Sequence, residues 1–189
     1  PVVQVYGPSV CVAETQCVLD RHRYCDWYGA SKEQAFRLTK REYTDAIRRL
    51  DALVSNRFLV QIDLANHHIA AAALASVVNA KYQYRRRSGT RNRKANSARV
   101  KPPMGATDCV VAGIAIDLAA RVGSDDVAVV TADKRLADVI EACRKLSRSK
   151  AEGLALPDLA RRIGTEWSND MYPNALNIAQ ADDSHLAKI

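Results

Sequence analysis

Two aspartates stand at positions where carboxylates can do chemistry. Asp133 comes just past the apolar run at residues 127–131, which has the pattern of a parallel strand buried on both faces, and Asp108 opens an apolar helix. Ligands of open α/β sheets bind outside the carboxyl ends of the strands, so we expect both side chains near such an edge. Carboxylate oxygens suit Mg²⁺ and Mn²⁺, and such an ion can acidify a water and neutralise a phosphodiester.

The elements that must position these aspartates alternate between strands and helices. Short runs rich in apolar and β-branched residues predict strands at residues 2–12, 58–62 and 127–131. Helices are predicted from near Ala13, behind the capping-box pair Ser31 and Gln34, from Asp63 to about Asn79, from Asp108 to Gly123, and over residues 136–146 and 157–163. Such alternation with short connections predicts an α/β fold with a mainly parallel sheet flanked by helices.

Composition narrows the class of protein. Of the 189 residues, 48% are hydrophobic and only 6% are aromatic, which favours one globular domain with helices on a short sheet over an all-β sandwich. No run approaches the roughly 20 apolar residues of a membrane span, and residues 1–12 show no secretory leader. We therefore expect a cytoplasmic protein without a membrane segment. The five cysteines lack zinc-ligand spacing and are interpreted as reduced.

One segment makes the protein basic. Residues 81–101 hold nine Lys or Arg and no acid, whereas the other 19 basic residues are balanced by 21 acids in a chain of net charge +7. We interpret residues 81–104 as an exposed loop whose arginines, with Tyr82 and Tyr84, favour binding of RNA phosphates and stacking on bases. A solvated loop without a ligand and an acidic protein partner are the alternatives. The candidate RNA-binding residues are Arg85, Arg86, Arg87, Arg91, Arg93 and Lys94.

Two stretches resemble the PIN domain family of ribonucleases. Residues 105–146 read GATDCVVAGIAIDLAARVGSDDVAVVTADKRLADVIEACRKL, similar to the family's Asp at the start of an Ala-rich helix and a strand ending in Thr-x-Asp-x-x-Leu. Residues 5–21, VYGPSVCVAETQCVLDR, resemble the strand and helix that carry the family's site glutamate, here Glu14. The resemblance is closest to the VapC-type toxins of toxin-antitoxin pairs, and it treats residues 81–104 as an insertion.

The resemblance implies a PIN-like, Rossmann-like three-layer sandwich and a divalent-metal-dependent endoribonuclease. Glu14, Asp108 and Asp133 would hold Mg²⁺ or Mn²⁺ directly or through water, and Thr131 would orient Asp133. The resemblance also implies a homodimer and, for a toxin, an antitoxin protein as a partner. The PIN-like domain would span residues 1–150, followed by a C-terminal extension of unknown role at residues 151–189.

The chain departs from the family at the first site acid, because no acidic residue precedes Glu14. In one account, the family's N-terminal strand and helix are absent and residues 5–12 are the second strand. In the other, YGPSV is the first strand, with Gly7 in place of the aspartate, and Glu14 is unrelated to the site. We prefer the first account because a helix of the right length follows Glu14. The missing acid leaves open a catalytically weakened PIN-like module for RNA binding or assembly.

Each candidate acid also has an ordinary structural interpretation. Asp108 and Asp133 can serve only as helix caps, and Glu14 can be an acid that the helix dipole favours near an N-terminus. His67 and His68 lie on a predicted helix with no ligand partner four residues further on. For these two histidines, packing or surface placement is the preferred interpretation.

Overall fold

The computed structural model describes residues 3–24, 37–88 and 104–179, with their side chains except at positions 82–88. This described part is a mixed α/β structure with seven α-helices and two short sheets, each of two parallel strands. The expectation of an α/β fold with parallel strands is confirmed at that level. The chain divides into two compact units, Pro1–Leu64 and Ala65–Ile189, and each is described by itself. Within the described ranges, no helix is long and apolar enough to cross a membrane.

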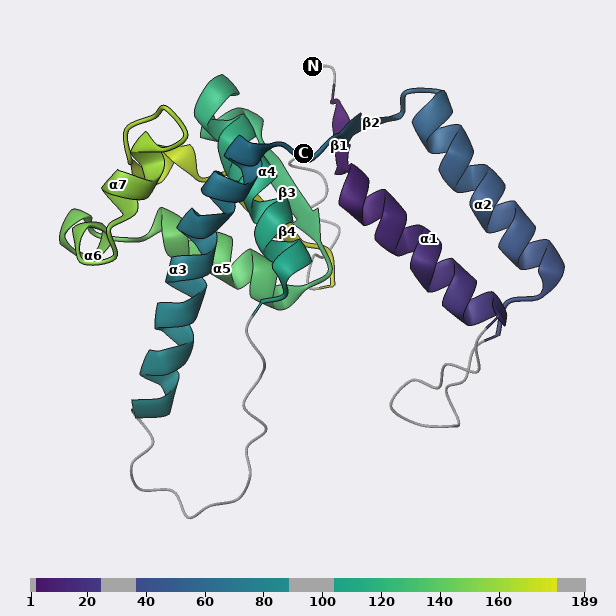
Figure 1. Cartoon of the computed structure of the whole chain (residues 1–189), viewed down its shortest axis with the longest axis horizontal. Coiled ribbons are helices and arrows are strands. Elements are labelled where there is room, and N and C mark those ends of the chain that lie inside the picture. The colour runs from purple at the N-terminus through teal and green to yellow at the C-terminus, as the bar shows by residue number, and fades with distance from the viewer. Residues whose placement is uncertain (1–2, 25–36, 89–103, 180–189) are drawn as a thin grey trace, which may run out of the picture. The chain divides into compact units, whose positions relative to one another are not determined.

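The first unit consists of β1 (Val5–Pro8), α1 (Ser9–Tyr24), α2 (Lys40–Ser55) and β2 (Leu59–Ile62) (Figure 1). The strands are parallel, with Val5 opposite Leu59. Side chains join the two helices: the Tyr43 hydroxyl donates to Asp20 Oδ1 at 2.8 Å. Of the residues that the structure describes in this unit, only Gly7 and Leu38 are buried. The described part of the first unit, residues 3–24 and 37–64, therefore has hardly any apolar core.

The first strand is shorter than the sequence predicts. It ends at Pro8, and α1 begins at Ser9 rather than near Ala13. Proline fixes its own φ and has no backbone N–H to donate to a neighbouring strand, so it is suited to the end of a strand rather than to its middle. Pro8 therefore ends the strand that the sequence predicted to continue to residue 12.

The helix α2 begins with a complete capping box. Glu42 Oε2 accepts the backbone N–H of Thr39 at 2.8 Å, and the backbone N–H of Glu42 donates to the Thr39 hydroxyl at 3.2 Å. Two N–H groups that have no partner within the helix are satisfied in this way. The capping box that we predicted at Ser31 and Gln34 lies outside the described residues.

The second unit is larger and has its own core. It contains α3 (Asn66–Ser88), α4 (Ala106–Val122), β3 (Ala128–Thr131), α5 (Lys134–Arg144), α6 (Arg148–Glu152), α7 (Leu156–Arg161) and β4 (Asn174–Asn177), with 3-10 turns at Ser124–Asp126 and Asn169–Met171. β3 and β4 are parallel, with Ala128 opposite Asn174. The sequence did not predict β4, because Asn-Ala-Leu-Asn contains no β-branched or aromatic residue.

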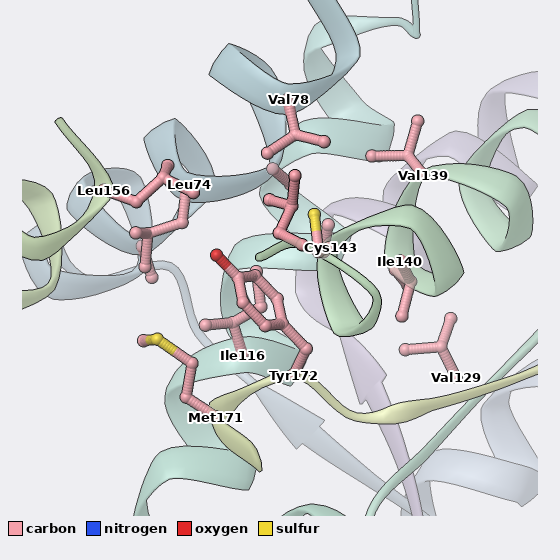
Figure 2. Close-up of a cluster of buried hydrophobic side chains, with 14 of the residues drawn as sticks. Leu74, Val78, Ile116, Val129, Val139, Ile140, Cys143, Leu156, Met171 and Tyr172 are labelled. Atoms are coloured by element: carbon pink, nitrogen blue, oxygen red, sulfur yellow. The ribbon is translucent and has the colours of Figure 1, made fainter. Parts of the chain in front are cut away.

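The core of the second unit is a single apolar cluster that includes residues from near both ends of it (Figure 2). Leu74 of α3, Ile116 of α4 and Ile140 of α5 are fully buried, and so are Leu156 and Tyr172. Each such side chain contributes about 2 kcal/mol by leaving water. Residues 151–179, which we predicted to be an extension of unknown role, supply part of this core.

The helix α3 runs to Ser88, so it enters the segment that we predicted to be a loop from residue 81. Lys, Gln and Arg are good helix formers, and the first strong helix breaker after this point is Gly89. The high charge that indicated a loop is compatible with an exposed end of a helix. For residues 81–88 the loop prediction was therefore wrong.

The helices α3 and α4 approach each other closely at Gly113. A Cβ at that position would lie 2.5 Å from the carbonyl oxygen of His68 and 2.6 Å from the backbone nitrogen of Ala72. Real side chains do not come that close to a backbone, so this contact requires glycine. Gly113 thus brings the start of α3 against the middle of α4.

Candidate functional site

Asp133 lies between β3 and α5, where it caps the helix. Its Oδ1 accepts the backbone N–H of Arg135 at 2.7 Å, and its Oδ2 lies 3.0 Å from Nη2 of the Arg135 guanidinium. The side-chain hydrogen bond from Arg135 is the main cause that holds the pKa of Asp133 below its ordinary value, although partial burial acts in the opposite direction. Asp133 is therefore an anion at neutral pH, as a carboxylate ligand of a cation must be.

Thr131 is the last residue of β3, and its hydroxyl oxygen accepts the backbone N–H of Asp133 at 3.0 Å. This bond across two residues is the ordinary turn that Ser and Thr make with the chain that follows. It fixes the backbone from which the Asp133 side chain projects. The contact is thus with the main chain of Asp133 and not with its carboxylate.

Asp108 lies in the first turn of α4. Its Oδ2 accepts the backbone N–H of Gly105, the residue before the helix, at 3.0 Å. Gly105 has no side chain to return the bond, so this is half of a capping box. Asp108 is partly buried, and it lies at the positive end of the helix dipole.

Arg135 connects the two aspartates electrostatically. Its pKa is raised mainly by the hydrogen bond and the charge of Asp133, and the charge of Asp108 adds to the effect. Because α4 leads through a short turn into β3 and contacts it, the start of the helix and the end of the strand fall at the same end of this unit. Asp108, Asp133 and Thr131 therefore lie toward the same end of the second unit.

Glu14 belongs to the first unit, where it is exposed on α1. The contacts described around Asp108 and Asp133 are all within the second unit. Among the predicted RNA-binding residues, Arg85, Arg86 and Arg87 are in the last turns of α3, but nothing beyond their helical backbone is described. Arg91, Arg93 and Lys94 lie outside the described residues.

The sequence analysis missed a second polar cluster, between α3 and α4. Asp117, buried on α4, has its Oδ2 3.5 Å from His67 Nε2 and 3.8 Å from His68 Nε2. Arg121 donates two hydrogen bonds to the same carboxylate, at 2.8 and 3.1 Å. The partners come from different helices, so no spacing along the chain connects them. An acid inside an otherwise apolar helix, four residues before Arg121, was the available signal.

Two of the described cysteines are held as thiols by burial. Among the described residues, Cys11, Cys17, Cys109 and Cys143 form no disulfide, and Cys25 lies outside the described residues. Burial raises the pKa of the Cys143 thiol strongly, and it is the main cause that raises the pKa of Cys109. Thiolates are disfavoured at both positions, which agrees with their interpretation as small hydrophobic residues.

No protein-family model matches the chain, and no curated protein or solved structure shows significant similarity to it. The residues and their arrangement are therefore the basis of the proposals below.

Proposed function

We propose that the protein is a divalent-metal-dependent endoribonuclease with a PIN-like fold, in which Asp108 and Asp133 hold the metal ion. The observation that carries this proposal is that both aspartates raise the pKa of Arg135, which pairs with Asp133 just after the carboxyl end of β3. The two carboxylates, at the starts of α4 and α5, both attract the Arg135 guanidinium and therefore make an anionic site. In α/β proteins the carboxyl ends of strands are where ligands bind.

The donor set fits Mg²⁺ or Mn²⁺, because both residues offer only oxygen. A carboxylate has about four acceptor positions, so the hydrogen bonds from Gly105 to Asp108 and from Arg135 to Asp133 leave some of them for a cation. When bound, the ion would supply an acidified water and neutralise charge on the phosphodiester.

Arg135 has a natural part in this site. It neutralises Asp133 in the structure, with Nη2 at 3.0 Å from the carboxylate. A dication that takes over this neutralisation would leave the guanidinium beside the site, where it can bind a phosphate oxygen with two parallel hydrogen bonds. Thr131 keeps the turn of Asp133 fixed through its hydroxyl.

The proposed substrate is RNA, because the basic residues of the chain concentrate in residues 81–101. Arginines neutralise phosphates and stack on unpaired bases, and no base sequence is required for either contact. If the protein is a toxin, an antitoxin protein would bind it and hold it inactive. We also propose that the protein forms a homodimer.

Substitution of each aspartate by asparagine tests the proposal. Asn keeps an oxygen that accepts the same backbone N–H, so the helix caps stay while the negative charge is lost. We expect Asp108→Asn and Asp133→Asn each to lower Mg²⁺- or Mn²⁺-dependent RNA cleavage about 100-fold or more, and EDTA to abolish cleavage by the unchanged protein. The matched control is Asp138→Asn, an exposed acid of α5 that pairs with Lys134 at 3.3 Å. Cleavage at the unchanged level by both site variants would contradict the proposal.

A second candidate function is a PIN-like module that binds RNA or an assembly without cleaving. The observation that favours it is that each aspartate already caps a helix: Asp108 accepts the backbone N–H of Gly105, and Asp133 accepts that of Arg135. In that case the purified protein would leave RNA intact even at high Mn²⁺, while its affinity for RNA would still fall steeply with salt.

A further inference from the structure

His67, His68, Asp117 and Arg121 gather at the opposite end of α4 from Asp108. Asp117 is nine residues further along the helix than Asp108, which corresponds to about 13 Å. The carboxylate of Asp117 and the ring of His68 are buried, whereas 42% of the His67 side chain is exposed. This cluster is therefore separate from the pair of aspartates at β3, and solvent reaches it through His67.

We propose that His67, His68 and Asp117 bind a transition-metal ion of the zinc class. One ligand atom from each residue lies within 4.8 Å of the others, and Asp117 Oδ2 is 3.5 and 3.8 Å from the two Nε2 atoms. Two ligands of a tetrahedral zinc ion, each about 2.0–2.2 Å from the metal, are about 3.3–3.6 Å apart. The two distances to Asp117 are thus within a few tenths of an ångström of those that a bound ion needs.

The donor types decide which ions fit. Two imidazole nitrogens and one carboxylate oxygen suit Zn²⁺, Co²⁺ or Cu²⁺, whereas Mg²⁺ prefers oxygen donors throughout. The site therefore differs in ion preference from the proposed site at Asp108 and Asp133. Three protein ligands also leave at least one position on the ion for water.

Metal binding exchanges one hydrogen bond of His68. Its Nδ1 accepts the backbone N–H of Ala65 at 3.1 Å, so the proton of the neutral ring is on Nε2, facing Asp117. Coordination through Nε2 requires the proton to be on Nδ1 instead, and the bond from Ala65 is then given up. Asp117 can keep Arg121, because one of its oxygens has two lone pairs and can serve both a donor and the ion.

A bound ion would join α3 to α4 by coordination bonds. His67 and His68 are in the first turn of α3, and Asp117 is one helical turn beyond Gly113, where the two helices come closest. An ion that binds only the folded protein stabilises it in proportion to the logarithm of its concentration over the dissociation constant. The midpoint of thermal unfolding should therefore rise with added Zn²⁺.

The test uses the full chain, freed of metal, with Co²⁺ followed by visible absorption and Zn²⁺ followed by thermal unfolding. We expect saturable binding of one Co²⁺ and a higher unfolding midpoint with Zn²⁺. His67→Gln removes a half-exposed ligand without disturbing the core, and it should weaken Co²⁺ binding at least tenfold and abolish the rise of the midpoint. Asp117→Asn should have the same effect on binding, and circular dichroism checks that it is folded.

Two controls separate this site from other ligands. His22→Gln makes the same replacement in the first unit, and Asp138→Asn removes an exposed acid of α5 that belongs to neither site; both should bind Co²⁺ like the unchanged protein. Equal affinity of the unchanged protein and His67→Gln, or a thiolate absorption band that survives in that variant, would overturn the proposal. A protein without nuclease activity could still have this metal site, because the two proposed sites share no residue.

Discussion

The Asp133 carboxylate makes two kinds of contact with one neighbouring residue. Through Oδ1 it caps α5 at the Arg135 N–H, and through Oδ2 it binds the Arg135 guanidinium. The first contact needs only an oxygen, whereas the second needs a negative charge. This difference is why asparagine can preserve the helix and still remove the ability to hold a cation.

Arg135→Ala is expected to raise the pKa of Asp133, because the side-chain hydrogen bond from Arg135 is the main cause of its depression. A depressed pKa in the folded state stabilises the protein above the unfolded-state value of about 3.9, and this contribution is lost as the pH falls through the folded value. The unchanged protein should therefore exceed the variant in free energy of unfolding near pH 7, by about 0.5–1 kcal/mol for this partly exposed pair, and the difference should shrink in acid.

The measurement is an NMR titration of the Asp133 carboxyl group, together with urea unfolding between neutral and acidic pH. Lys145→Ala is a suitable control, since it removes a cation from an exposed pair with Glu141 at the other end of the same helix. If the pKa of Asp133 were the same in Arg135→Ala, the guanidinium could not be the cause of the lowered pKa.

Residue positions could be predicted where a local pattern defines them. Asp133 comes just after a run of apolar residues and Asp108 just before one, so the sequence alone predicted both at ends of elements. Their common neighbour Arg135 could not be predicted, because its side chain folds back over a turn of the chain. Asp117 was missed for a related reason: its histidine partners come from another helix.

At the scale of elements, three helices of the chain begin in the same way. A side chain of the first turn reaches back to the backbone N–H of the residue before the helix: Glu42 to Thr39, His68 to Ala65 and Asp108 to Gly105. Each bond satisfies an N–H that the helix itself leaves without a partner. The capping-box pattern requires Ser or Thr before the helix and Glu or Gln three residues later. The pair Ala65 and His68 does not fit this pattern and could not be predicted from it.

Gly113→Ala tests the contact of α3 with α4. In an exposed helix this change would stabilise the protein by up to about 1 kcal/mol, because alanine favours helix. Here the added Cβ would meet the backbone of His68 and Ala72 at 2.5–2.8 Å, and backbone cannot move aside as a side chain can. We therefore expect a loss of about 3 kcal/mol in the free energy of unfolding, measured by urea denaturation.

Gly153→Ala is the matched control for that change. Its Cβ would lie 3.4 and 3.6 Å from its nearest neighbours, which is ordinary contact. Its φ of −63° is allowed for any residue, so we expect little change in stability. If both variants were equally stable, the close approach at Gly113 would be wrong.

Elements with a strong local signal were predicted, and those fixed by distant contacts were not. The apolar run before Asp133 gave β3, and the Ala-rich run after Asp108 gave α4. β4 has no such signal, and it is a strand because its backbone pairs with β3. The end of α3 was placed too early because charge in a sequence does not distinguish a loop from an exposed helix.

At the scale of the whole molecule, apolar burial is unevenly divided. The second unit encloses a continuous core that includes Leu74, Ile116, Ile140 and Tyr172, while the described part of the first unit buries only Gly7 and Leu38. A chain of about 60 residues is marginal in stability even with a good core. This division could not be predicted, because the apolar residues of the sequence are spread over both units.

The two units should therefore differ when they are produced separately. A fragment of residues 65–189 is expected to unfold cooperatively in urea, with loss of helical circular dichroism in one transition, because its core is intact. A fragment of residues 1–64 should show no such transition. A cooperative transition in the shorter fragment and none in the longer one would contradict the division of the core.

The pairing of β3 with β4 has a consequence for the order of folding. The partner strands are separated by α5, α6 and α7, so their hydrogen bonds, such as that from Asn174 to Val127, close a long loop of chain. Contacts of this separation form slowly, whereas a helix forms within microseconds. On the ribosome, β3 must wait with its edge unpaired until residue 177 has been synthesised, and in that interval it is exposed to association with other nascent chains.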